Sequence, residues 1–76
     1  MDVIETADVR LAAYAMARGG GLRVIDRAEG PLFRLEGPGI EVAEIDYAHF
    51  GPCGVSPDRL ERLAEMLRTV GGRRCL

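Results

Sequence analysis

The stretch TADVRLAAYAMARG, from Thr6 to Gly19, decides how the rest of this chain is expected to fold. On a period of 3.6 residues it carries two apolar stripes on roughly opposite sides of one helix. One stripe consists of Val9, Ala12, Ala13 and Met16, and the other of Leu11, Tyr14 and Ala15. A helix that is apolar on two sides is normally covered on two sides, so the sequence predicts an interior helix.

Local signals mark both ends of this helix. Thr6 is a suitable N-cap residue, and Asp8 in the first turn would interact favourably with the helix dipole. Arg18 suits the C-terminal end, and the run Gly19-Gly20-Gly21 supplies the left-handed residue that commonly terminates a helix. A phosphate-binding loop would place its glycines before a helix, so we interpret this run as a cap and connector.

The length and composition of the chain limit what it can build. Its 76 residues correspond to one domain, residues 1–76, near the lower limit for independent folding. The sequence is 47% hydrophobic with no Trp, two Phe and two Tyr, so the core is expected to consist mainly of aliphatic residues and Ala. Such a core gives marginal stability unless a disulfide, a metal or self-association supplements it. We therefore expect a homo-oligomer or a complex with another protein.

Charge and targeting signals argue against several classes of protein. The chain has 10 basic residues, all of them Arg, and 12 acidic residues, and its net charge of −2 argues against a dedicated nucleic-acid-binding protein. The acidic N-terminus lacks the features of a signal peptide, and no apolar run approaches the ~18 residues that span a membrane. With two cysteines, Cys53 and Cys75, and no secretory signal, the expected location is a reducing cytoplasm.

Two segments after the glycine run are expected to form a β-hairpin. Residues 22–28 and 31–36 alternate as strands do, and Glu29-Gly30 between them is the expected turn, which places Val24 opposite Leu35. The face expected to lie against the 6–19 helix consists of Leu22, Val24, Phe33 and Leu35. The other face carries Arg23, Ile25, Arg27, Leu32, Arg34 and Glu36. We interpret this second face as solvated, with the Arg stems covering the two aliphatic side chains.

The remaining segments are less uniform. Residues 3–5 are short and partly β-branched, and are expected to form an edge strand or an extended segment. Residues 40–50 fit a helix but also a strand with a bulge, and we favour the helix. Ser56-Pro57 opens a final helix that is expected to end at Gly71-Gly72. Its apolar stripe consists of Leu60, Leu63, Ala64, Leu67 and Val70.

The polar residues do not assemble into an evident catalytic or metal site. Asp46, His49 and Cys53 have a spacing that invites a metal interpretation, but zinc needs a fourth ligand, for which only Cys75 is an obvious candidate. A chain this small also lacks the walls of a water-excluding pocket around a Cys53–His49 pair. We therefore expect no catalytic site, no metal site and no cofactor, and a protein that is not an enzyme.

Several features together resemble a family of short bacterial and phage domains of unknown function. The shared features are Thr6-x-Asp8-x-x-Leu11-Ala12-Ala13-Tyr14, a glycine-ended helix, a hairpin centred on Phe33, and Val55-Ser56-Pro57 opening the last helix. The chain departs from the family pattern at Ala7, where a second Thr is typical, in its three successive glycines, and at Gly37-Pro38-Gly39. The resemblance implies no activity or cofactor. The occurrence of the family around phage and mobile-element genes implies an accessory or interaction role.

These observations predict a small α+β domain with the element order (β)-α-β-β-α-α, in which the hairpin packs on helices. The predicted function is that of a non-enzymatic protein–protein interaction or accessory module that self-associates and is related to phage or mobile elements. The expected interface is the apolar stripe left uncovered on the 6–19 helix, with Leu11, Tyr14, Ala15 and Arg18. The alternative is a nucleic-acid-associated regulator that uses the Arg face of the hairpin, with Arg23, Arg27 and Arg34.

Overall fold

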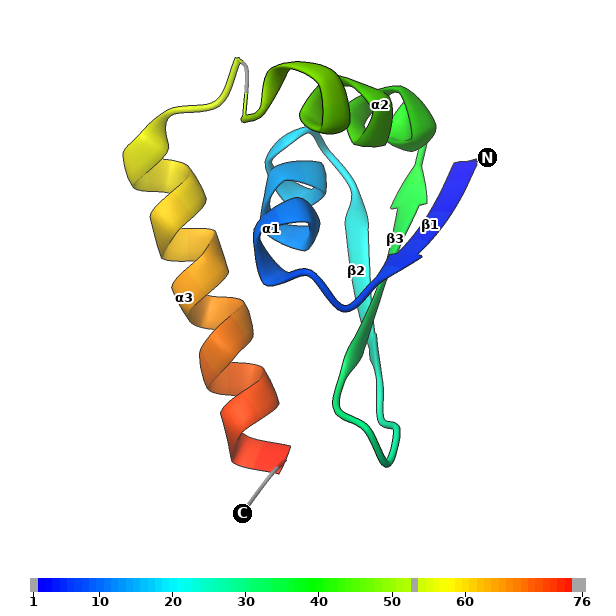
Figure 1. Cartoon of the computed structure of the whole chain (residues 1–76), viewed down its shortest axis with the longest axis vertical. Helices are drawn as coiled ribbons and strands as arrows, with labels where there is room; N and C mark the ends of the chain where they lie inside the picture. The colour runs from blue at the N-terminus through cyan, green and yellow to red at the C-terminus, as the bar shows by residue number, and fades with distance from the viewer. Residues whose placement is uncertain (1, 53, 75–76) are drawn as a thin grey trace.

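The computed structural model describes residues 2–52 and 54–74, with side chains described as far as Thr69. The strands β1 (Asp2–Thr6), β2 (Gly21–Ile25) and β3 (Leu32–Gly37) form an antiparallel sheet in the order β1-β3-β2. The helices are α1 (Val9–Ala17), α2 (Ile40–Phe50) and α3 (Pro57–Arg74). This element order confirms the predicted α+β fold. Figure 1 shows α1 between the sheet and α3, with α2 running across the top of both α1 and the sheet.

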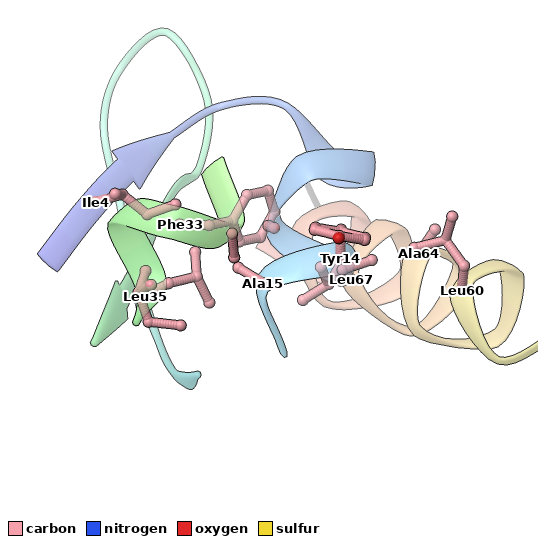
Figure 2. Packing of buried hydrophobic residues seen from close by; sticks show 12 residues of the cluster. Ile4, Tyr14, Ala15, Phe33, Leu35, Leu60, Ala64 and Leu67 are labelled. Atoms are coloured by element: carbon pink, nitrogen blue, oxygen red, sulfur yellow. The ribbon is translucent and has the colours of Figure 1, made fainter. Parts of the chain in front are cut away.

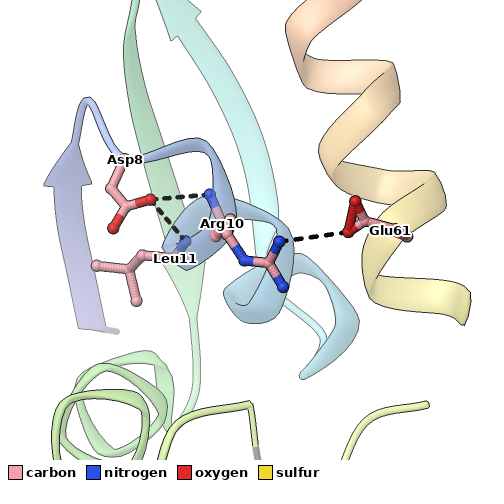
Figure 3. Close-up of polar contacts among 4 residues, drawn as sticks. All are labelled: Asp8, Arg10, Leu11 and Glu61. Atoms are coloured by element: carbon pink, nitrogen blue, oxygen red, sulfur yellow. Dashed lines mark hydrogen bonds and ion pairs between the residues drawn. The ribbon is translucent and has the colours of Figure 1, made fainter. Parts of the chain in front are cut away.

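The first helix begins two residues later than the sequence predicts. Its N-cap is Asp8 rather than Thr6, because the Asp8 carboxylate accepts hydrogen bonds from the backbone N–H groups of Arg10 (2.9 Å) and Leu11 (3.4 Å), as Figure 3 shows. Thr6 supports this cap from outside the helix, where its hydroxyl accepts a hydrogen bond from the Asp8 N–H at 3.0 Å. A carboxylate is the stronger acceptor and carries the charge that a helix N-terminus favours.

The glycine run ends α1 as predicted. The Gly20 N–H donates to the carbonyl of Ala15 at 2.9 Å, and the Gly19 N–H donates to that of Met16 at 3.0 Å. These two bonds form a Schellman motif, for which Gly19 supplies the positive φ of 102°. A Cβ atom on Gly20 would lie 2.8 Å from Cδ1 of Ile40 and 3.0 Å from the Ala15 oxygen. The end of α1 can therefore lie directly against the start of α2.

Both sides of α1 are covered by its own chain. Four consecutive residues have no exposed surface: Ala12, Ala13, Tyr14 and Ala15. Three of them are alanines, whose small side chains allow neighbouring elements to approach closely. Figure 2 shows this helix between two groups of buried side chains, Ile4, Phe33 and Leu35 from the sheet and Leu60, Ala64 and Leu67 from α3. The prediction of an interior helix is confirmed, and the cover comes from within one chain.

The hairpin keeps its predicted faces but has a different register. Val24 lies opposite Phe33, whereas a turn at Glu29-Gly30 would have placed it opposite Leu35. The observed turn comes one residue earlier, where the Gly30 N–H donates to the carbonyl of Arg27 at 3.1 Å. Glycine is favoured at the last position of such a turn, and Gly30 has a φ of 125°. Because the shift is two residues, Phe33 and Leu35 remain on the core face, where both are buried.

The N-terminal segment, expected to form an edge strand or an extended segment, is an edge strand. β1 pairs with β3 and places Ile4 opposite Leu35, so that Ile4 is buried. The strand also contacts α2. At that junction the Asp2 carboxylate accepts a hydrogen bond from the N–H of Gly39, the residue that precedes α2, at 3.2 Å. Gly39 has a φ of 79°, which explains why the break between β3 and α2 contains glycine.

Residues 40–50 form a helix, which confirms the prediction that favoured a helix over a strand with a bulge. Its inward side places Ile40 and Ala43 in the core, and Tyr47 packs against that core. The last helix begins at Pro57, as predicted, and the Leu60 N–H donates to the carbonyl of Ser56 at 3.0 Å.

The predicted end of this last helix is wrong, because α3 continues through Gly71-Gly72 to Arg74. A glycine in a helix costs about 1 kcal/mol relative to alanine, which weakens the helix without ending it. In the predicted stripe, Leu60, Ala64 and Leu67 are buried and Leu63 packs against them. The side chain of Val70 lies outside the described part of the chain.

Candidate interaction surfaces

The interface predicted on α1 is occupied by the protein's own core. Tyr14 and Ala15 are fully buried, Leu11 is half-buried, and only Arg18 of the four predicted residues is exposed. Tyr14 packs against Tyr47 of α2, with ring centroids 5.4 Å apart and the rings tilted by 52°. The assignment of Tyr14 and Ala15 to an interface is therefore corrected: α2 and α3 supply the cover that was expected from a partner.

The exposed Arg18, at the C-terminal end of α1, links α1 to α2. Its Nη1 donates a hydrogen bond to the Tyr14 hydroxyl at 2.6 Å and lies 3.4 Å from a carboxylate oxygen of Asp46. Its guanidinium carbon also lies 5.5 Å from the centre of the Tyr14 ring. The hydrogen bond with Tyr14, and after it the contact with Asp46, raise the pKa of Arg18 above its ordinary value. Arg18 thus keeps its positive charge, opposite the Asp46 carboxylate, and joins two helices.

The residues considered for metal or nucleophile chemistry are not assembled in the described structure. Asp46 pairs with Arg18, and the ring of His49 lies beside that of Phe50, with centroids 6.2 Å apart. Cys53 and Cys75 lie outside the described residues. Among residues 2–52 and 54–74, no three His, Cys, Asp or Glu side chains come together to hold a metal ion. Over the same residues, no helix is both long and apolar enough to cross a bilayer.

The predicted basic face of the hairpin is largely balanced by carboxylates. Arg34 lies between Glu36, at 3.1 Å, and Glu5 of the neighbouring strand, at 4.0 Å. Arg27 lies in the loop rather than in a strand, 3.3 Å from the carboxylate of Glu29. Arg23 lies opposite Arg34 in the sheet, and no carboxylate pairs with it among the described residues. The face therefore lacks the surplus of positive charge that phosphate binding requires.

A shallow hollow of about 210 Å³ lies at the start of β2. Its lining consists of Gly21, Leu22, Arg23 and Glu36. Pockets that hold drug-sized ligands usually have volumes of ~300–1,000 Å³ and enclose most of the ligand. This hollow is smaller and open, so the structure offers no small-molecule site there.

The three most exposed large hydrophobic residues of the described chain all lie on α2. Val42 is 54% exposed, Ile45 is 56% exposed and Phe50 is 75% exposed. Val42, Ile45 and His49 follow the spacing i, i+3, i+7, so they share the side of the helix opposite the buried Ile40 and Ala43. We call Val42, Ile45 and His49, together with Phe50 at the exposed C-terminal end of the helix, the outer face of α2; Phe50 itself follows the row of Ala43 and Tyr47, at the end where that row is no longer covered. In Figure 1, α2 lies at the top of the molecule, with α1 and the sheet, which it contacts, below it.

Acidic residues lie along one flank of α2: Glu41 is one turn from Ile45 of the outer face, whereas Glu44 lies nearer the side of the buried Ile40. Glu41 is exposed and Glu44 is half-buried, and neither forms an ion pair within the described chain. Asp46, the third acidic residue of α2, is held by Arg18. The outer face therefore combines exposed aliphatic and aromatic groups with unpaired negative charge.

The sequence contained a signal for the outer face of α2. The helical interpretation of residues 40–50 relied on Ala43, Tyr47 and Phe50 as one apolar side, yet Phe50 is the most exposed of the large hydrophobic residues described. The second set at helical spacing, Val42 and Ile45, was equally visible, and together the two sets make α2 apolar on opposite sides. Residues 40–50 thus carry two apolar rows at helical spacing, as residues 6–19 do, and this pattern indicates a helix with a second apolar side.

A scan against protein-family models and searches of curated proteins and of solved structures find no match to this chain. The resemblance to the bacterial and phage family thus gains no support from these comparisons. What can be inferred about function rests on the residues of the chain itself.

Proposed function

We propose that this protein is a small, non-enzymatic interaction module that binds another protein surface through the outer face of α2. The observation that supports this proposal most directly is the exposure of Val42, Ile45 and Phe50 on a helix that is apolar on both sides. A helix that is apolar all round is usually buried all round, and α2 has cover on one side only. The uncovered side therefore has the character of an interface rather than of a solvated surface.

Covering this face would contribute to binding, as one part of a larger interface. Burying a whole Val, Ile or Phe side chain contributes about 1.5–3 kcal/mol. The three residues are between 54% and 75% exposed, so covering what remains exposed would contribute about 3–5 kcal/mol in total. Each 1.4 kcal/mol changes a dissociation constant about tenfold, so this face alone would strengthen binding by a factor of ~100 or more.

The charge around the outer face describes the expected partner. Glu41 and Glu44 have no basic partner among the described residues of their own chain. A partner that covers Val42 and Ile45 would approach the carboxylate of Glu41, one turn from Ile45, and a basic side chain at its rim would then form an ion pair. We infer that the partner presents aliphatic side chains bordered by arginine or lysine. The same acidic border disfavours nucleic acid as the ligand of this face.

Removing the apolar groups from the outer face tests this proposal. The double variant Ile45→Ser/Phe50→Ser should keep its fold, because both side chains are mostly exposed. Protein isolated gently from its own cells should have a native mass well above the 8.3 kDa of one chain, and the variant should have the mass of one chain. Native mass spectrometry measures both, and circular dichroism checks the fold.

The matched control is Val3→Ser, which removes an apolar side chain that is 37% exposed on β1, on the face of the sheet opposite the buried Ile4. This variant should retain the mass of the wild-type particle. The proposal is wrong if the wild-type protein is isolated as a single chain, or if Ile45→Ser/Phe50→Ser retains the larger particle.

A further inference from the structure

The strand β2 lies at the edge of the sheet. It pairs with β3 on one side, and the described chain provides no strand on its other side, which we call the free edge of β2 (Figure 1). Leu22 and Val24 of β2 pack against the core but are only half-buried. Their partners on β3, Leu35 and Phe33, are buried. A free edge presents a row of backbone N–H and C=O groups that an added strand can pair with.

Arg23, the middle residue of β2, has no carboxylate partner among the described residues. It is exposed, and it lies opposite Arg34, whose guanidinium already lies between Glu36 and Glu5. A strand added at the free edge would place a residue directly opposite Arg23 on its other side. Opposite charges at such a position stabilise a pair of strands, so the added strand should carry Asp or Glu there.

Gly21, the first residue of β2, lines the hollow of about 210 Å³ together with Glu36. The fold does not require a glycine at this position. Gly21 is not among the glycines with a positive φ, and a Cβ there would meet only the Glu36 carbonyl oxygen, at an ordinary contact distance of 3.7 Å. A glycine in a strand often marks a place where a ligand or another backbone approaches closely.

The hollow can therefore take one side chain from an added strand. The Glu36 carboxylate holds Arg34 at 3.1 Å, and its two oxygens can accept further hydrogen bonds. A basic side chain opposite Gly21 would extend across the hollow toward this carboxylate and form a charge-assisted hydrogen bond. The residue opposite Gly21 should thus be Arg or Lys.

We propose that the free edge of β2 binds an extended segment of another protein as an added antiparallel strand. The segment places an acidic residue opposite Arg23, a basic residue opposite Gly21, and apolar residues opposite Leu22 and Val24. Read along an antiparallel strand, this is the pattern apolar-acidic-apolar-basic. Backbone hydrogen bonds supply affinity, and the alternate side chains supply specificity. This site lies on a different element from the outer face of α2, so it goes beyond the proposed function.

The charge of β2 disfavours a second β2 strand as the occupant. A two-fold pairing over the whole strand, Gly21–Ile25, would place Arg23 opposite the same residue of the second copy. Like charges directly opposite each other destabilise a pair of strands. Moving the register by two residues places Arg23 opposite Gly21 or Ile25, neither of which can neutralise it. An extended segment with its own acidic residue avoids both problems.

Two synthetic hexapeptides test the pattern. Thr-Val-Glu-Val-Arg-Thr carries it, and Thr-Val-Arg-Val-Glu-Thr has the same composition with the two charges exchanged. In an NMR titration of the isotope-labelled full chain, the first peptide should shift the backbone amides of β2 and bind about tenfold or more tightly than the second. Amides on the free edge should also exchange more slowly with solvent when the first peptide is bound, because strand addition gives them acceptors.

Two variants test the residues that read the pattern. Arg23→Glu replaces a like-charged pair with Arg34 by an opposite pair, so it should fold, and it should bind the two peptides within about threefold of each other. Gly21→Thr puts a side chain into the hollow and should weaken binding of the first peptide without loss of the fold. Arg68→Glu, an exposed charge reversal on α3, is the control and should bind as the wild type does.

The inference is wrong if neither peptide binds at ~1 mM, if the two bind equally well, or if Arg23→Glu keeps the wild-type preference. It is also wrong if the chain alone forms oligomers that Arg23→Glu dissociates, since a second copy would then occupy the free edge. The proposed function is tested separately. Ile45→Ser/Phe50→Ser alters only α2 and should bind the first peptide as tightly as the wild type does.

Discussion

At the scale of single residues, the most consequential contact joins Tyr14 to Arg18. Tyr14 is fully buried, and Arg18 donates a hydrogen bond to its hydroxyl at 2.6 Å. This hydrogen bond offsets the free-energy cost of removing the Tyr14 hydroxyl from water when the ring is buried. Arg18 then extends the contact to Asp46, so one side chain links α1 with α2.

Replacing Tyr14 by Phe tests the value of this contact. Tyr14→Phe keeps the ring and removes the acceptor of the Arg18 hydrogen bond, so the free energy of unfolding should fall by about 0.5–1.5 kcal/mol. Urea unfolding followed by circular dichroism measures the change. The matched control is Tyr47→Phe on the opposing ring, which should change stability by less than about 0.5 kcal/mol. An unchanged midpoint for Tyr14→Phe would show that the hydroxyl contributes nothing.

At the scale of elements, α1 depends on its caps more than a longer helix would. It has nine residues, and isolated helices below ~12–15 residues are marginal in water. Asp8 satisfies two N–H groups at its start, and the Schellman motif satisfies carbonyl groups at its end. Packing then supplies the remaining stability, because the four central residues of the helix are fully buried.

The cap identified in the structure leads to a second stability prediction. Asp8→Ala should lower the free energy of unfolding by about 0.5–2 kcal/mol, since two backbone donors lose their acceptor. Asp8→Asn should retain most of the stability, because asparagine is nearly as good an N-cap residue. Thr6→Ala should cost less than Asp8→Ala, although the sequence alone pointed to Thr6 as the cap. Thermal and urea unfolding distinguish these cases, and the reverse order would show that Thr6 is the cap in solution.

At the scale of the whole molecule, the small size of the chain connects its stability with its proposed assembly. A domain of 76 residues leaves a large share of its surface exposed, and here part of that surface is the outer face of α2. A partner that binds only the folded chain stabilises it by mass action. Self-association would therefore supply what the core of so short a chain lacks.

This connection predicts a concentration-dependent melting temperature. Well above the dissociation constant of a dimer, each tenfold rise in protein concentration should stabilise each folded chain by about 0.7 kcal/mol, because the free monomer rises only as the square root of the total; this corresponds to a few degrees in Tm. Differential scanning calorimetry at ~10 μM, 100 μM and 1 mM measures the trend. The Tm of Ile45→Ser/Phe50→Ser should not depend on concentration, and equal slopes for the two proteins would exclude the outer face of α2 as the site of association.

The sequence by itself determined the elements and most of their faces, because these depend on residues close together in the chain. The spacing of apolar residues predicted α1, α2 and α3, and alternation placed Phe33 and Leu35 on the core face of the hairpin. Local signals were less decisive where two residues competed for one role. Thr6 and Asp8 are both good caps, and the choice between them depends on where the preceding strand ends.

Only the tertiary structure decided which apolar surface the chain leaves exposed. Two helices, α1 and α2, are apolar on opposite sides, and the sequence does not reveal which of them lies in the centre. The sheet and α3 enclose α1, whereas α2 lies at the edge of the molecule with one side uncovered. The physical reason is that burial depends on contacts between segments far apart in the chain, which the local spacing of apolar residues does not specify.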